Sequence, residues 1–176
     1  NNTISTIKSV AGQPKATDYA DVIYGMAGND TINAGGGADT IYGGAGNDKI
    51  AGEYGNDCLG GGYGDDVILG GDGDDKMSGW LGNDTMLGEY DDDKLFGGEG
   101  NDRLSGGEGD DCISGGQDDD IISGGTGRDK MSGGTGNDSF VFQENEWEGF
   151  EGWANRDVIK DWNEGDQIVY CGQGPE

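Results

Sequence analysis

Aspartate recurs at every ninth residue over most of this chain, and this spacing is the feature most able to support chemistry. Fourteen consecutive nine-residue units run from Ala16 to Val141 without a change of register. One regular copy, at residues 43–51, reads GGAGNDKIA, and the sixth position is Asp in all fourteen units. Carboxylates at a fixed spacing can bind hard divalent cations, or they can work in pairs as acid and base.

Thirteen of these aspartates are candidate metal ligands, because carboxylate oxygens are the ligands that Ca²⁺ prefers. They are Asp30, Asp39, Asp48, Asp57, Asp66, Asp75, Asp84, Asp93, Asp102, Asp111, Asp120, Asp129 and Asp138. Asp21 is left out because its unit lacks the glycines of the later units.

The same repeat predicts the fold. The eighth position is apolar in all fourteen units. Positions seven to nine therefore predict a short strand with its middle side chain inward, and the glycine-rich positions one to six predict a turn. Two units make a coil of eighteen residues, so the chain is expected to form an all-β, right-handed parallel β-roll (solenoid) of about seven coils over residues 16–141. Residues 1–15 are expected to cap its N-terminal end, and the aromatic-rich residues 142–176 its C-terminal end.

Such a coil needs a cation. Fourteen inward side chains do not offset the entropy lost by 126 glycine-rich residues, and stacked aspartates repel one another. Ca²⁺ accepts about six to eight oxygens in flexible geometry, whereas Mg²⁺ gives up its water reluctantly. Six gaps between seven turns on each edge predict about ten to twelve Ca²⁺ ions. Twelve ions carry a charge of +24, close to the size of the net charge of −26.

The composition argues against several partners and activities. The chain has 36 acidic and 10 basic residues and no His. Nucleic acid and a bare anionic membrane are therefore not expected as partners, since both would be repelled. The absence of His excludes HExxH zinc chemistry, and neither a GxSxG elbow nor a P-loop lysine is present. The regular carboxylates single out no catalytic pair, so no enzyme is predicted.

The units, written G-G-x-G-x-D-x-U-x, resemble the nonapeptides of the RTX (repeats-in-toxin) family. The tail segments 136–142, 157–162 and 165–168 resemble the part that caps the last RTX coil. The resemblance implies a parallel β-roll with each ion between the turns of units n and n+2, held by sixth-position Asp carboxylates and glycine carbonyls. It also implies secretion by a Gram-negative bacterium through a type I exporter, with folding outside the cell.

The glycines whose backbone carbonyls the resemblance assigns to metal binding are Gly43, Gly44, Gly46, Gly61, Gly62, Gly64, Gly70, Gly71, Gly73, Gly97, Gly98, Gly100, Gly106, Gly107, Gly109, Gly124, Gly125 and Gly127.

Outward side chains leave alternatives open. Lys76, Lys94 and Lys130 share position seven on one predicted face and, with Trp80, form a candidate ligand face. These lysines either bind an acidic polysaccharide or reduce repulsion by pairing with neighbouring aspartates. The main prediction is a calcium-folded module that stabilises a secreted bacterial protein. The alternatives are a surface-layer or adhesion module that binds glycan or neighbouring copies, and a non-catalytic module of a secreted hydrolase or polysaccharide-modifying enzyme.

The cysteines and the tail aromatics have simpler interpretations. Cys58 and Cys112 lie three coils apart, and ~14 Å at the strand spacing is beyond disulfide reach, so free thiols are predicted. The tail aromatics are expected to cover the open apolar end of the roll. They are Trp147, Phe150, Trp153, Trp162 and Tyr170.

Overall fold

A computed structural model describes residues 4–6, 18–143 and 157–171. These residues form β-strands and no helix, so no helix among them is long and apolar enough to cross a membrane. The strands are β1 (Ile4–Thr6), β2 (Val22–Ala27), β3 (Thr31–Gly36), β4 (Thr40–Ala45), β5 (Lys49–Tyr54), β6 (Cys58–Tyr63), β7 (Val67–Asp72), β8 (Lys76–Leu81), β9 (Thr85–Tyr90), β10 (Lys94–Glu99), β11 (Arg103–Glu108), β12 (Cys112–Gln117), β13 (Ile121–Thr126), β14 (Lys130–Thr135), β15 (Ser139–Gln143), β16 (Val158–Ile159) and β17 (Gln167–Cys171).

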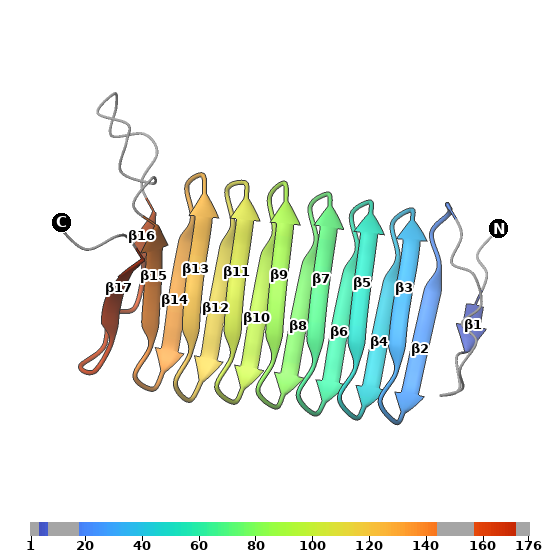
Figure 1. Ribbon diagram of the computed structural model, residues 1–176, viewed down its shortest axis with the longest axis horizontal. Helices are drawn as coiled ribbons and strands as arrows, with labels where there is room; N and C mark the ends of the chain where they lie inside the picture. Colours follow the sequence, from blue (N-terminus) through green and yellow to red (C-terminus); the bar gives the residue numbers. More distant parts are fainter. Residues whose placement is uncertain (1–3, 7–17, 144–156, 172–176) are drawn as a thin grey trace.

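Successive strands alternate between two parallel sheets. The first sheet has the order β1-β2-β4-β6-β8-β10-β12-β14-β16, and the second has the order β17-β15-β13-β11-β9-β7-β5-β3. Within the repeats the register is offset by eighteen residues, so Leu95 pairs with Ile113 on one side and with Met77 on the other. Figure 1 shows the resulting ladder of strands, with turns stacked along both edges. The predicted parallel β-solenoid of about seven coils is confirmed.

The core is a single column of side chains from each sheet. The eighth-position residues are all at most 4% exposed. They are Ile23, Ile32, Ile41, Ile50, Leu59, Ile68, Met77, Met86, Leu95, Leu104, Ile113, Ile122, Met131 and Phe140, and Ala34 joins them. Each coil therefore buries only two large apolar side chains, which leaves little hydrophobic stabilisation per residue ordered.

The strands are longer than the sequence predicts. Each strand from β2 to β14 spans six residues, as in Lys49–Tyr54, so only positions four to six remain as turn. Position two takes a left-handed backbone even where it is not glycine. The φ angles of Met26, Glu53, Trp80 and Glu89 lie between 79° and 83°. The glycines of positions one and two thus belong to a bent strand, and the bend explains why their composition suggested a turn.

The tail adds a further coil beyond the repeats. Ile159 of β16 pairs with Met131, and Ile168 of β17 pairs with Phe140. The rings of Phe140 and Trp162 stack at a centroid distance of 6.1 Å. Trp162 therefore packs on Phe140, the last residue of the apolar core column of the second sheet.

The other predicted cap residues are only partly described. Trp147, Phe150 and Trp153 lie outside the described residues, and the backbone of Tyr170 lies in β17. Of the N-terminal segment 1–15, only residues 4–6 are described, and they pair with β2.

Candidate metal sites

The sixth-position aspartates form two buried columns, one along each edge of the solenoid. One column holds Asp21, Asp39, Asp57, Asp75, Asp93, Asp111 and Asp129, and the other holds Asp30, Asp48, Asp66, Asp84, Asp102, Asp120 and Asp138. Each of these residues is at most 6% exposed. For the twelve column aspartates from Asp21 to Asp120, the backbone N–H donates to Oδ1 of the aspartate eighteen residues later, as Asp75 does to Asp93 at 2.8 Å. One carboxylate oxygen therefore links consecutive coils.

The other carboxylate oxygen has no partner. Oδ2 is buried and makes no hydrogen bond in the thirteen aspartates from Asp30 to Asp138. In the described part of the chain, the one ion pair joins Arg128 to Asp110, which is not a member of either column. A buried, unpaired carboxylate oxygen carries a large desolvation penalty. Thirteen of them in register call for a ligand that supplies positive charge.

The protonation of these groups reflects the same imbalance. Burial is the main cause that raises the pKa of Asp57 to about 6, of Asp75 to about 7 and of Asp93 to about 8. Neighbouring carboxylates raise these values further, while the backbone N–H of the preceding aspartate lowers them. In the absence of a cation, these three carboxyl groups therefore keep their protons to a higher pH than an ordinary aspartate does.

A cradle for an ion lies beside the first glycine of a unit. A Cβ added to Gly43 would lie 2.5 Å from Oδ2 of Asp48 and 2.6 Å from the carbonyl oxygen of Gly61, one coil further on. The missing side chain therefore leaves a space bordered by a carboxylate and a backbone carbonyl. Such hard oxygen donors fit Ca²⁺, whose bonds to oxygen are about 2.3–2.6 Å long.

The candidate ligands are mostly backbone oxygens. Among the described residues, no group of three or more Asp, Glu, Cys or His side chains converges on one point. Carbonyls of positions three and six accept ladder hydrogen bonds, as Tyr63 does from Gly46 at 2.7 Å and Asp75 does from Lys94 at 2.9 Å. Because these two carbonyls are already engaged, an ion beside one carboxylate would draw its other oxygens from other backbone carbonyls or from water.

The comparison with known families agrees with this geometry. The family described as RTX calcium-binding nonapeptide repeat (4 copies) matches residues 16–50, 35–62, 51–86, 87–122 and 114–141. The chain belongs to this RTX repeat family. Among curated proteins, no significant match is found.

The glycines assigned to the RTX sites occupy two different environments. The carbonyl of a first-position glycine faces the Oδ2 of the preceding coil, as Gly61 faces Asp48. The carbonyl of a second-position or fourth-position residue lies against the α-carbon of the same position one coil on, as at Gly44 and Gly46. Of these carbonyls, the first-position set lies nearest the unpaired carboxylates.

Two aspartates that sequence reasoning missed continue the RTX columns into the tail. The N–H of Asp129 donates to Oδ1 of Asp157 at 3.0 Å, and that of Asp138 donates to Oδ1 of Asp166 at 3.1 Å. A later turn therefore covers Asp138, and the columns do not end with the last repeat. The available signal was the nine-residue spacing of Asp157 and Asp166, each followed two residues later by Ile.

The side chains at position five form a second ladder of hydrogen bonds, which the sequence analysis did not predict. The side-chain oxygen of Asn29 accepts from the N–H of Asn47 at 3.0 Å, and that of Asn83 accepts from Asn101 at 2.9 Å. Asn or Asp fills this position in eleven of the fourteen units, which was the available signal. These exposed groups satisfy turn N–H groups that would otherwise face only water.

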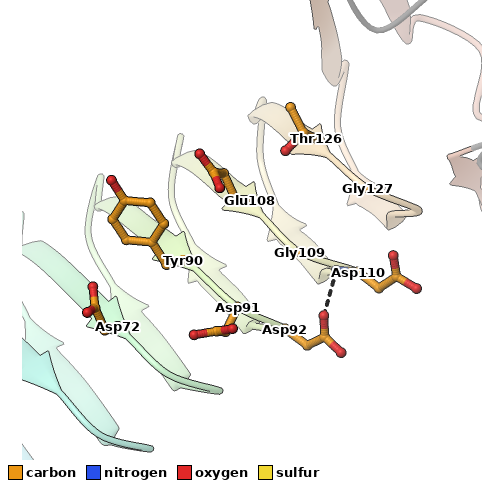
Figure 2. A pocket seen from close by; sticks show the side chains of 9 residues that line it. All are labelled: Asp72, Tyr90, Asp91, Asp92, Glu108, Gly109, Asp110, Thr126 and Gly127. Atoms are coloured by element: carbon orange, nitrogen blue, oxygen red, sulfur yellow. Dashed lines mark hydrogen bonds between the residues drawn. The ribbon is translucent and has the colours of Figure 1, made fainter. Parts of the chain in front are cut away.

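One edge also carries an open acidic groove of 790 Å³ (Figure 2). It is lined by Asp72, Tyr90, Asp91, Asp92, Glu108, Gly109, Asp110, Thr126 and Gly127. Asp91 stands where most units have Gly and has a φ of 72°. The acidic side chains are exposed, so water can solvate them, in contrast with the buried columns.

The lysines of the candidate ligand face are not paired. Lys76, Lys94 and Lys130 are exposed on the first sheet, and none lies within 4.0 Å of a carboxylate oxygen in the described residues. These lysines therefore form no direct ion pair with the aspartate columns. Cys58 and Cys112 are exposed free thiols in the same row, as predicted.

Proposed function

We propose that this RTX chain is a calcium-dependent folding module that acts outside the cell and stabilises a secreted bacterial protein. One observation carries the proposal: thirteen buried Asp Oδ2 atoms, stacked coil upon coil, have no hydrogen-bond partner. In a chain with a net charge of −26, these carboxylates oppose folding until a cation binds them.

The proposed ligands are the aspartates from Asp30 to Asp138 together with glycine carbonyls of the turns. Seven turns on each edge leave six gaps, so about twelve ions are expected. Because no site exists in the unfolded chain, the binding free energy of the ions is also folding free energy. Calcium is then scarce enough in the cytosol for the chain to stay unfolded there and abundant enough outside for it to fold.

Secretion through a type I exporter is part of this proposal and is supported by membership of the RTX family. No catalytic role is proposed for the repeats, because their carboxylates are uniform along the columns and already linked to backbone N–H groups. A glycan-binding role is a separate proposal with its own test.

The test is a Ca²⁺ titration of the EDTA-stripped chain. Far-UV circular dichroism should show a steep, cooperative gain of β signal, and native mass spectrometry should count about ten to twelve ions at saturation. Mg²⁺ at the same concentrations serves as the control and should not fold the chain. Stable β structure in EDTA at neutral pH would refute the proposal.

A further inference from the structure

The outer face of the first sheet differs from the acidic edges. Tyr24, Tyr42 and Phe96 project from it at position nine and are 39%, 47% and 53% exposed. The rings of Tyr24 and Tyr42 stack with centroids 5.2 Å apart. Lys76 and Lys94 lie in the neighbouring row of the same face. Aromatic rings and cations thus occupy neighbouring rows on one face of the first sheet.

Gly60 leaves bare backbone between the rings of Tyr42 and Trp80, and this backbone is called the glycine floor here. Gly60 is the only glycine at a ninth position, and it lies in register between Tyr42 of β4 and Ser78 of β8. A Cβ on Gly60 would lie 3.7 Å from Cδ1 of Tyr42 and 4.0 Å from Nε1 of Trp80. The indole of Trp80 therefore reaches from β8 across to β6, and the two rings flank a strip of bare backbone.

Strand β8 has two features that oppose folding. Trp80 has a φ of 82°, a left-handed conformation that costs a bulky residue energy and that glycine adopts freely. Lys76 pairs directly with Lys94, and like charges on paired residues are destabilising. Both features belong to one face of one strand. Local violations of this kind persist most often where a ligand uses them.

We infer that the aromatic–lysine strip, formed by Tyr42, Gly60, Trp80, Lys76 and Lys94, binds an acidic oligosaccharide. The C–H face of a sugar ring can lie on the glycine floor against the electron-rich faces of the indole and tyrosine rings. Uronate carboxylates can then neutralise the two lysines and remove their repulsion. The inference goes beyond the calcium function but rests on it, because the strip exists only in the folded solenoid.

The probe is a galacturonic acid hexamer, titrated calorimetrically into the calcium-folded chain with free Ca²⁺ matched in both solutions. A neutral glucose hexamer is the ligand control. Trp80→Gly restores the residue that suits this backbone, so folding should be retained while binding weakens about tenfold or more. Glu89→Gly makes the same backbone change on the second sheet and should leave binding unaltered.

One further variant tests the glycine floor, and one further pair of variants tests the charges. Gly60→Ala meets only ordinary contacts, so the chain should fold normally, yet the methyl group occupies the floor and should weaken binding severalfold. Lys76→Glu should abolish measurable binding, whereas Lys49→Glu, at position seven of the second sheet, should not.

The inference is overturned if the folded wild-type chain does not bind the acidic hexamer, or if Trp80→Gly and Glu89→Gly weaken binding equally. Equal affinity for the neutral hexamer overturns the role of the lysines. A concentration-dependent dimer lost only in Trp80→Gly would identify a second copy of the chain as the occupant instead. Circular dichroism with Ca²⁺ on each variant separates these failures from a failure to fold.

Discussion

Replacing Asp93 by Asn tests the column at its centre. Asp93 is 1% exposed, its Oδ1 accepts from the N–H of Asp75, and its Oδ2 has no partner. Asn keeps an acceptor for that N–H but offers an amide group where Oδ2 was, so one ion should be lost. At a Ca²⁺ concentration a hundredfold above its dissociation constant, one ion contributes about 2.7 kcal/mol to the free energy of unfolding.

The sign of the effect should reverse without calcium. Burial, together with the charges of Asp75 and Asp111, raises the pKa of Asp93 to about 8. At pH 8 in EDTA, the charged form of this side chain therefore opposes folding, and Asn removes the charge. With solvent screening at the solenoid edge taken into account, the variant should be more stable than wild type by about 1–2 kcal/mol.

The assay is urea unfolding followed by circular dichroism, at saturating Ca²⁺ and in EDTA with a stabilising osmolyte, with ions counted by native mass spectrometry. Asp92→Asn is the matched control, because this exposed neighbour accepts from Asp110 and loses the same charge. Equal effects of the two variants, or a loss of stability at Asp93 in both conditions, would show that Oδ2 does not bind the ion.

Three further perturbations test other parts of the site. Gly43→Ala fills the cradle beside the first glycine, so it should remove one ion and lower the free energy of unfolding with Ca²⁺ by about 2–4 kcal/mol. The control Gly60→Ala should lower it by under about 1 kcal/mol, and calcium titrations of the two variants make the comparison. Burial raises the pKa of the nine column aspartates from Asp57 to Asp129 to between about 6 and about 8. The stability that they give the calcium-free fold is therefore complete below about pH 4 and is lost as the pH rises through that range. Acidification in EDTA from pH 8 to pH 5 should therefore increase the β signal. The same change of pH should weaken Ca²⁺ binding because protons compete for the carboxylates, and an unchanged midpoint of the Ca²⁺ titration would contradict this. Asp161→Ala removes the acceptor of the Gly133 and Gly134 N–H groups and should destabilise the tail by about 1–3 kcal/mol, read as faster hydrogen exchange in β16 and β17.

The sequence predicted the parts of the fold that obey translational symmetry. A side chain such as Ile50 or Asp48 has the same environment in every coil, so a fixed period of nine determines both its burial and its neighbours. The strand length was mispredicted because glycine was taken as a turn signal, although Glu53 adopts the same left-handed backbone within β5.

What breaks the symmetry was harder to predict. The tail coil resumes after an insertion, and only its register with Met131 and Phe140 identifies it as part of the solenoid. The convergence of Trp80 and Tyr42 over Gly60 depends on residues from three different strands, and no periodic pattern encodes it.

The alternation of successive units between the two sheets restricts how such a chain can change length in evolution. Loss of two units shortens the rod by one coil and leaves every outward residue on its original face. Loss of a single unit instead transfers all later residues to the opposite face, so Lys94 and Phe96 would part from Tyr42 although their local sequences were intact. The core and the aspartate columns do not depend on whether an odd or an even number of units is lost, because both faces use the same eighth and sixth positions. A surface function is therefore kept only when an even number of units is gained or lost, whereas calcium binding is kept when any number is gained or lost.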